Sequence, residues 1–171
     1  QEGADVISYF LTPATVCLAI PLSEQMELLT TNFKAFLVGI LSGVLTSLVR
    51  VLAMSVFFGL THKAYTTFLP QSITTAIGMG VSEALGGYVT LTVAIIIITG
   101  ILGSILAEAA CKVFHITEPI AKGVAIGTAS HAIGTSKAME MGETEGAISG
   151  LSIAVAGLLT VAGASIFACF L

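Results

Sequence analysis

Two stretches without a single charged side chain, residues 84–107 and 146–171, limit most strongly how this chain can fold. At about 1.5 Å of rise per residue, a helix over either stretch exceeds the roughly 30 Å hydrocarbon thickness of a bilayer. The composition agrees, since 56% of the residues are hydrophobic and 9% are charged, whereas a soluble domain is about 25% charged. We therefore expect an all-α, polytopic membrane helix bundle that forms a single domain over residues 1–171.

Phe33 to Leu60 is a further apolar stretch that predicts a membrane helix, and the helix over the first charge-free stretch is expected to run from Tyr88 to Phe114. Gly39 and Gly43 stand four residues apart in the Phe33 to Leu60 stretch, a spacing that lets another helix approach closely. Arg50 lies inside the same helix, where a charge is costly unless it faces protein, water or a lipid headgroup. Two interpretations of Arg50 stay open: the side chain snorkels toward one interface, or it has a role in the protein interior.

A polar, glycine-rich run from Glu118 to Gly142 interrupts what would otherwise be another membrane helix. Glycine costs about 1 kcal/mol per interior helix site relative to alanine, and serine and threonine compete for backbone hydrogen bonds. We expect two half-helices that meet at an unwound centre. In a bilayer, such a centre is tolerated only where protein or a water-filled cavity satisfies its backbone. The run is therefore a candidate site, with Thr128, Ser130, His131, Gly134 and Thr135 at its centre.

A second interrupted helix is expected from Val6 to Leu22, because Thr12-Pro13-Ala14-Thr15 falls in its middle and proline breaks a helix interior. Paired interrupted helices in corresponding positions of two halves are typical of transporter binding sites. We expect half-repeats over about residues 6–60 and 70–171, with the two broken helices forming a crossed pair. Thr12, Pro13 and Thr15 would then face the centre of the first run.

The stretch from Pro70 to Gly87 is too polar for a lipid-exposed span and predicts a short broken or re-entrant helix. Whether it crosses the membrane stays open at this point. Thr74 and Thr75 are candidate binding hydroxyls. Glu83 is either a proton or cation ligand, or an interfacial charge at a helix end.

Several of these segments closely resemble the LrgB/CidB membrane protein family. The matching residues are LTPATVCLAIPL (11–22), SITTAIGMGVSEALGG (72–87), TGILGSIL (99–106) and, most specifically, GTASHAIGTSKAMEMGETEGAISGL (127–151). The resemblance covers essentially the whole chain. It implies a fold like that of the cation:proton antiporter and bile-acid symporter group, with two more hydrophobic helices upstream of residue 1. It also implies a multi-pass protein of the bacterial cytoplasmic membrane and a small holin-like partner of the LrgA/CidA type.

The first function hypothesis is a secondary transporter of small monocarboxylates such as pyruvate, glycolate or glycerate, the substrates that the resemblance implies. Half-helix N-termini suit a carboxylate, because their free amides and positive dipole end attract anions. His131 would bind the anion or carry a coupled proton, since imidazole titrates near physiological pH; its alternative is a buried structural imidazole. The coupling ion would be H⁺ or Na⁺, with His131 and Glu83 as the coupling groups. The binding candidates are Thr12, Pro13, Thr15, Thr74, Thr75, Thr128, Ser130, His131, Gly134 and Thr135.

The alternative function, from the same resemblance, is a holin- or antiholin-like regulator of murein hydrolase activity and lysis, acting with the small partner and as a homo-oligomer. An intramembrane hydrolase is disfavoured, because Ser130 and His131 are adjacent and point about 100° apart on a helix. Cys17, Cys111 and Cys169 show no metal-ligand spacing, so neither a metal nor another cofactor is expected. No basic patch suggests nucleic acid.

Overall fold

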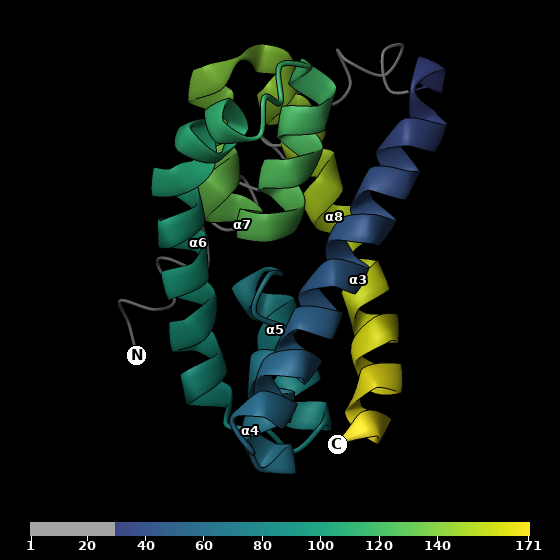
Figure 1. Cartoon of the computed structure of the whole chain (residues 1–171), viewed down its shortest axis with the longest axis vertical. Helices are drawn as coiled ribbons and strands as arrows, with labels where there is room; N and C mark the ends of the chain where they lie inside the picture. Colours follow the sequence, from purple (N-terminus) through teal and green to yellow (C-terminus); the bar gives the residue numbers. More distant parts are fainter. Residues whose placement is uncertain (1–29) are drawn as a thin grey trace, which may run out of the picture.

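The computed structural model describes residues 30–171, and three long helices form its frame (Figure 1). They are α3 (Phe33–Phe57), α6 (Val89–Val113) and α8 (Glu143–Phe167), and α8 continues into the short 3₁₀ helix η1 (Ala168–Phe170). Each is long and apolar enough to cross a membrane. In Figure 1, α3 and α8 run from top to bottom, and α6 runs in the opposite direction. The expected all-helical membrane bundle is confirmed for the described residues.

Helix α7 (Pro119–Met141) contains the interruption that the glycine-rich run predicted. It begins with Pro119 in its first turn, where the missing amide hydrogen costs nothing. At His131 the backbone leaves the helical region, with φ 42° and ψ −141°. Positive φ is unfavourable for a residue with a side chain, so this single residue marks the break.

The first arm of α7 runs parallel to α8. Gly123 packs against the side chain of Ile148, and Gly127 packs against Ser152. The partners advance together along both helices, which means that the two helices point the same way. Both contacts depend on glycine, because a Cβ on Gly123 would lie 2.9 Å from the Cβ of Ile148.

The second arm runs in the opposite direction. The hydroxyl of Thr135 lies 2.7 Å from that of Ser149, and farther along the arm Met139 packs against Gly146. Here the partners on α8 move backward as α7 moves forward. The two arms are therefore antiparallel, and α7 is a helical hairpin with its tip at His131, which we call the upper hairpin.

A second hairpin lies between α3 and α6. Because α3 ends and α6 begins at the lower end of the molecule in Figure 1, the segment between them enters and leaves from the same side. It consists of α4 (His62–Phe68), a turn, and the ten-residue α5 (Thr75–Ala84). Ten residues span only about 15 Å. The stretch from Pro70 to Gly87 therefore does not cross the membrane, and we call residues 62–84 the lower hairpin.

Hydrogen bonds hold the lower hairpin at its base and at its tip. The Thr92 hydroxyl of α6 lies 3.0 Å from the carbonyl oxygen of Thr67 and 2.7 Å from the Ser82 hydroxyl. At the tip, the hydroxyls of Ser47 on α3 and Ser72 are 3.1 Å apart. The lower tip is thus tied to the middle of α3.

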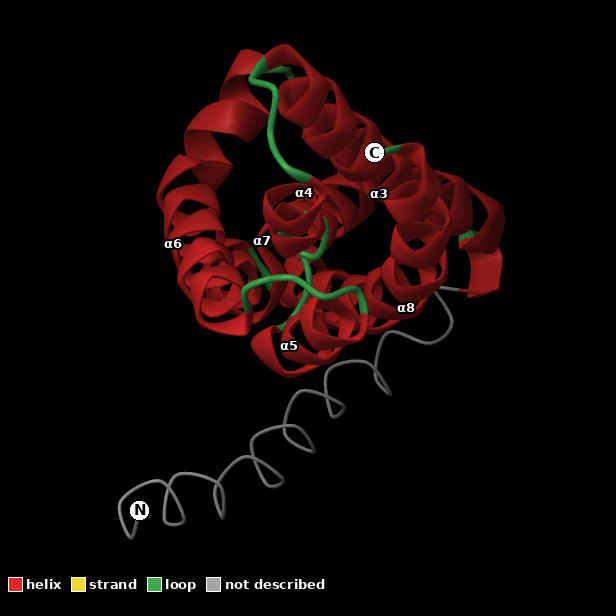
Figure 2. Ribbon diagram, turned by 90° about the horizontal axis from the view of Figure 1, so that it is seen from below, coloured by secondary structure: helices red, strands yellow, loops and turns green. Residues whose placement is uncertain are grey.

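The two hairpins enter the bundle from opposite ends, and their tips approach each other near mid-height (Figure 1). Seen from below in Figure 2, α4, α5 and α7 lie between α6 on one side and α3 and α8 on the other. The tips of the two hairpins also share a local sequence, since residues 72–78 read SITTAIG and residues 128–134 read TASHAIG. Both fit the pattern Ser/Thr-x-Ser/Thr-x-Ala-Ile-Gly. A long helix followed by a hairpin thus occurs twice, over residues 33–84 and 89–141, in opposite directions.

The direction of the break differs from the expected crossed pair. The break near His131 is present, but the chain turns back there and does not continue across the membrane. Small residues make the reversal possible, because Gly134 of the second arm lies directly against Ser130 and Ile126 of the first. The expected partner, Val6 to Leu22, and with it Thr12, Pro13 and Thr15, lies outside the described residues.

One face of α3 supplies most of the apolar core. Phe36, Ile40, Val44 and Leu48 are buried at helical spacing, in a cluster with residues of the first arm of α7 and of α8. On an adjoining face, Gly39 and Gly43 lie against Val124 and Thr128 of that arm, so the glycine pair does admit a close helix, as expected.

Candidate functional site

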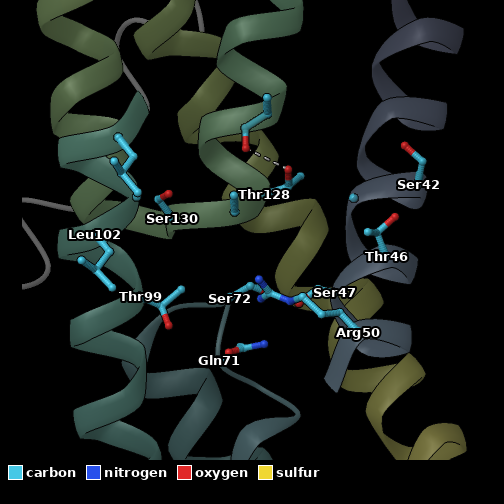
Figure 3. Close-up of a pocket in the computed structure, with 15 residues that line it drawn as sticks. Ser42, Thr46, Ser47, Arg50, Gln71, Ser72, Thr99, Leu102, Thr128 and Ser130 are labelled. Atoms are coloured by element: carbon cyan, nitrogen blue, oxygen red, sulfur yellow. Dashed lines mark hydrogen bonds between the residues drawn. The ribbon is translucent and has the colours of Figure 1, made fainter. Parts of the chain in front are cut away.

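A cavity of about 590 Å³ lies where the two hairpin tips meet α3 and α6 (Figure 3). This size falls within the range of small-molecule sites, about 300–1,000 Å³. Polar side chains come from all sides, although lipid-exposed helices surround the cavity. Its lining consists of Ser42, Gly43, Thr46, Ser47 and Arg50 of α3; Gln71 and Ser72 of the lower tip; Thr99, Leu102, Gly103 and Leu106 of α6; and Ala125, Thr128, Ala129 and Ser130 of α7.

The α3 wall of this cavity is a polar face that the sequence reasoning missed. Ser42, Thr46 and Arg50 follow one another at intervals of four residues, so they lie along one side of the helix. Ser47 lies beside them and contacts the lower tip. Hydroxyl residues at this spacing in an otherwise apolar membrane helix indicate a polar face. Of Ser42, Thr46 and Arg50, only Arg50 was considered from the sequence.

Arg50 is the one charged residue among the described residues that line the cavity. Its side chain leaves α3 and extends toward Ser72 at the lower tip (Figure 3). Within residues 30–171, its guanidinium forms neither an ion pair nor a hydrogen bond. The Arg50 side chain is exposed, so both interpretations of Arg50 from the sequence stay open.

Two of the predicted residues of the upper tip line the cavity. Thr128 is 6% exposed, and its hydroxyl donates to the carbonyl oxygen of Val124 at 2.7 Å and to that of Ala125 at 3.3 Å, the second of which is the bond drawn in Figure 3. The oxygen of that hydroxyl remains an acceptor. Ser130 is also buried and packs against Gly103 of α6, where any larger residue would collide with it.

His131 is buried, but it is not part of the cavity lining. Its Nε2 lies 3.0 Å from the carbonyl oxygen of Ile96 on α6. Since a carbonyl oxygen only accepts, Nε2 carries the proton in this bond. The ring lies against Gly100, where a Cβ would be 2.6 Å from the ring carbon Cε1. This geometry supports the structural alternative, in which the imidazole fixes the tip to α6.

Thr135 and Gly134 also belong to the hairpin and not to the cavity lining. The Thr135 hydroxyl donates to the carbonyl oxygen of His131 at 3.0 Å and contacts Ser149, and these bonds stabilise the first turn after the reversal. Gly134 allows the two arms to approach each other closely. Both positions shape the tip that carries Thr128 and Ser130.

The lower tip contributes neighbours of the predicted residues. Gln71 and Ser72 line the cavity, whereas Thr74 is the N-terminal capping residue of α5 and Thr75 its first helical residue. Glu83 is exposed near the opposite end of α5, outside the cavity. The N-terminus of α5, with its positive dipole end, thus lies at the tip that adjoins the cavity.

Ion pairs hold the base of the upper hairpin, well away from the tip. Lys122 of the first arm lies 3.5 Å from Glu145 of α8, and Lys137 of the second arm lies 2.7 Å from Glu108 of α6. Over residues 30–171, no group of three histidine, cysteine or acidic side chains is arranged to hold a metal ion.

Comparisons with known proteins agree on one family. The model of the family described as LrgB-like matches residues 1–170. Proteins named antiholin-like protein LrgB, from Bacillus mycoides (strain KBAB4) and Bacillus cereus (strain B4264), are 37% identical over 161 residues, which cover 94% of this chain and 70% of theirs. A protein of the same name from Bacillus anthracis (strain CDC 684 / NRRL 3495) matches equally well. No solved structure matches.

Proposed function

Because this chain belongs to the LrgB-like family, we propose that it is a secondary transporter that carries a small monocarboxylate between its two hairpin tips. One observation supports this proposal above the others: a cavity that carries several hydroxyl side chains and one cationic side chain, Arg50, lies between two opposed re-entrant hairpins, inside a multi-pass membrane protein. Broken helices and non-helical backbone at membrane depth are typical of transporter binding sites, where they line a cavity.

The chemistry of the lining suits a carboxylate. Ser72 and Thr46 offer hydroxyl donors, and Arg50 offers a positive charge. Among the described residues of the lining there is no aspartate or glutamate that would repel an anion. Pyruvate, glycolate and glycerate are the candidate substrates, and Thr12, Pro13 and Thr15 remain candidate contacts from the part of the chain before residue 30.

Uptake of labelled pyruvate and glycolate into proteoliposomes tests the proposal. The full-length protein is reconstituted alone and with its small LrgA/CidA-type partner, under imposed pH and Na⁺ gradients. We expect saturable uptake of at least one carboxylate that depends on one gradient, and we expect Thr128→Val and Ser72→Ala to reduce it. If no carboxylate enters under any gradient, transport is excluded.

We propose coupling to H⁺ or Na⁺, with His131 and Glu83 as the candidate coupling groups. His131 is fixed to α6 by its Nε2, and Glu83 is exposed, so each has a structural alternative. Under the coupling role, Glu83→Gln or His131→Ala changes how uptake depends on pH. A folded variant whose pH dependence equals that of the wild type removes that residue from the mechanism.

The second candidate function is an antiholin-like regulator of murein hydrolase activity. The names of the Bacillus relatives support this candidate more directly than they support transport. Such a regulator would associate with a small holin-like partner through lipid-facing surfaces, and α6 leaves many large apolar side chains exposed.

Lysis assays in cells that lack their own LrgB-type protein separate the two functions. If regulation depends on association alone, Thr128→Val restores normal lysis as well as the wild type does. If the lysis phenotype follows anion transport, the same substitution abolishes the rescue.

A further inference from the structure

We propose that Arg50 recognises the charge of the transported anion, and that it does so where the central cavity adjoins a second, apolar cavity, since Arg50 lines both. This inference rests on the proposed transport function and names the residue that would select an anion. It concerns a side chain whose role the sequence left open.

The position of Arg50 between two cavities is the first argument. The lower cavity, of about 470 Å³, is lined mainly by apolar residues near the end of α3 and by Phe68 of α4. It shares Arg50 and Gln71 with the central cavity. Arg50 belongs to α3 and Gln71 to the lower tip, so both elements contribute a polar side chain to both cavities.

A third cavity extends the series toward the opposite end. It has a volume of about 450 Å³, includes Asn32 and Glu118 near the upper end, and shares Gly43 and Thr128 with the central cavity. Residues that line the three cavities occur along the whole of α3, from its N-terminal capping residue Asn32 to its C-terminal capping residue Phe58. Arg50 stands where two of these three cavities share lining residues.

The lack of a partner for Arg50 is the second argument. Three of the five lysines form ion pairs with carboxylates, as Lys122 does with Glu145. Arg50 has no such partner within residues 30–171, although it lies inside a predicted membrane span. An unpaired charge inside a membrane segment is costly and usually functional. An anionic substrate would supply the missing partner.

The geometry of the guanidinium is the third argument. Its planar group donates two parallel hydrogen bonds to a carboxylate, which an ammonium group cannot do. Gln71 and Ser72 lie at the tip toward which Arg50 extends, and both carry further donors (Figure 3). A carboxylate beside Arg50 would therefore be bound from both α3 and the lower hairpin.

The experiment compares Arg50→Gln and Arg50→Lys with the wild type in proteoliposome uptake of labelled pyruvate and glycolate. Lys34→Gln is the matched control, because it removes a positive charge from the same helix at an exposed position outside the cavities. A second readout is the shift in unfolding temperature that each acid produces in detergent, with the neutral amide glycolamide as the comparison.

We expect Arg50→Gln to lower uptake and apparent affinity roughly 100-fold, and Arg50→Lys roughly 10-fold, because hydrogen bonds to charged groups carry this much affinity. Lys34→Gln should match the wild type, and glycolamide should stabilise no variant. If the wild type transports and Arg50→Gln transports equally well, the role of Arg50 is refuted while transport stands. If the wild type neither transports nor is stabilised by either acid, the proposed function fails first. If Arg50→Gln does not fold, Arg50→Met takes its place, and unchanged uptake by the folded Arg50→Met variant overturns the inference.

Discussion

Single glycines decide how closely the arms of the upper hairpin pack against α8. Gly127 lies directly against the backbone carbonyl of Ser149, and a Cβ at that position would also be 2.8 Å from the Cβ of Ser152. A backbone carbonyl in a packed helix cannot move aside as a flexible side chain can. A methyl group at Gly127 would therefore push the hairpin away from α8.

We predict that Gly127→Ala destabilises the protein by about 1–3 kcal/mol, the usual cost of overpacking. Gly80→Ala is the matched control, because Gly80 also lies within a helix but has no atom near its hypothetical Cβ. There, alanine should be neutral or stabilising. Thermal unfolding in detergent measures both variants, and equal melting temperatures would contradict the described packing.

The residues of the site were only partly predictable from the sequence. The position of Thr128 and Ser130 within a broken polar run marked them as candidates, and both line the cavity. His131 was a candidate because imidazole titrates near physiological pH. In the structure, its Nε2 is hydrogen-bonded to the carbonyl oxygen of Ile96 on α6. That contact depends on Gly100, which is far away in sequence. Local chemistry thus identified the tip, and tertiary packing decided which side chains face the cavity.

At the scale of elements, the hairpins differ from the crossed helices that the sequence suggested. Glycine and hydroxyl content showed where α7 stops being a regular helix, because both lower helix propensity locally. The direction of the next segment depends on the backbone angles of one residue, His131, and on the small side chains that let the arms meet. No periodicity in the sequence reports that angle, so a break was predictable and a reversal was not.

The ion pair at the base of the upper hairpin gives a prediction for this element. Glu145 is only 7% exposed and is paired with Lys122 of the first arm. Replacing Lys122 by methionine leaves a buried carboxylate without its partner, which we expect to cost about 1–3 kcal/mol.

Lys112→Met is the control for that variant, since Lys112 is 81% exposed and lies 4.0 Å from Glu108. An exposed pair contributes about 0–1 kcal/mol, so the control should melt close to the wild type. The charge exchange Lys122→Glu with Glu145→Lys should recover much of the loss. Equal melting temperatures for the two methionine variants would show that Lys122 does not stabilise the hairpin.

For the whole molecule, the central feature is that two hairpins with a shared tip sequence enter from opposite ends, and that both tips line the central cavity. The charge-free stretches predicted α6 and α8, and composition predicted a membrane bundle. The sequence alone did not predict that the hairpins enter from opposite ends, because this depends on which end of the bundle each pair of loops occupies. Such an arrangement suits the proposed transport, because the substrate would be bound between the two hairpin tips.

Side-specific labelling of single cysteines tests this arrangement most directly. In an active variant without native cysteines, a membrane-impermeant maleimide is applied to cysteines placed at His62 and Ala84, the two ends of the lower hairpin, and at Thr117 and Glu143, which flank the upper one. All four positions are exposed. We predict that positions 117 and 143 are labelled from one side of the membrane, and positions 62 and 84 from the other. Labelling of positions 117 and 143 from opposite sides would show that α7 crosses the membrane, and would contradict the opposed hairpins.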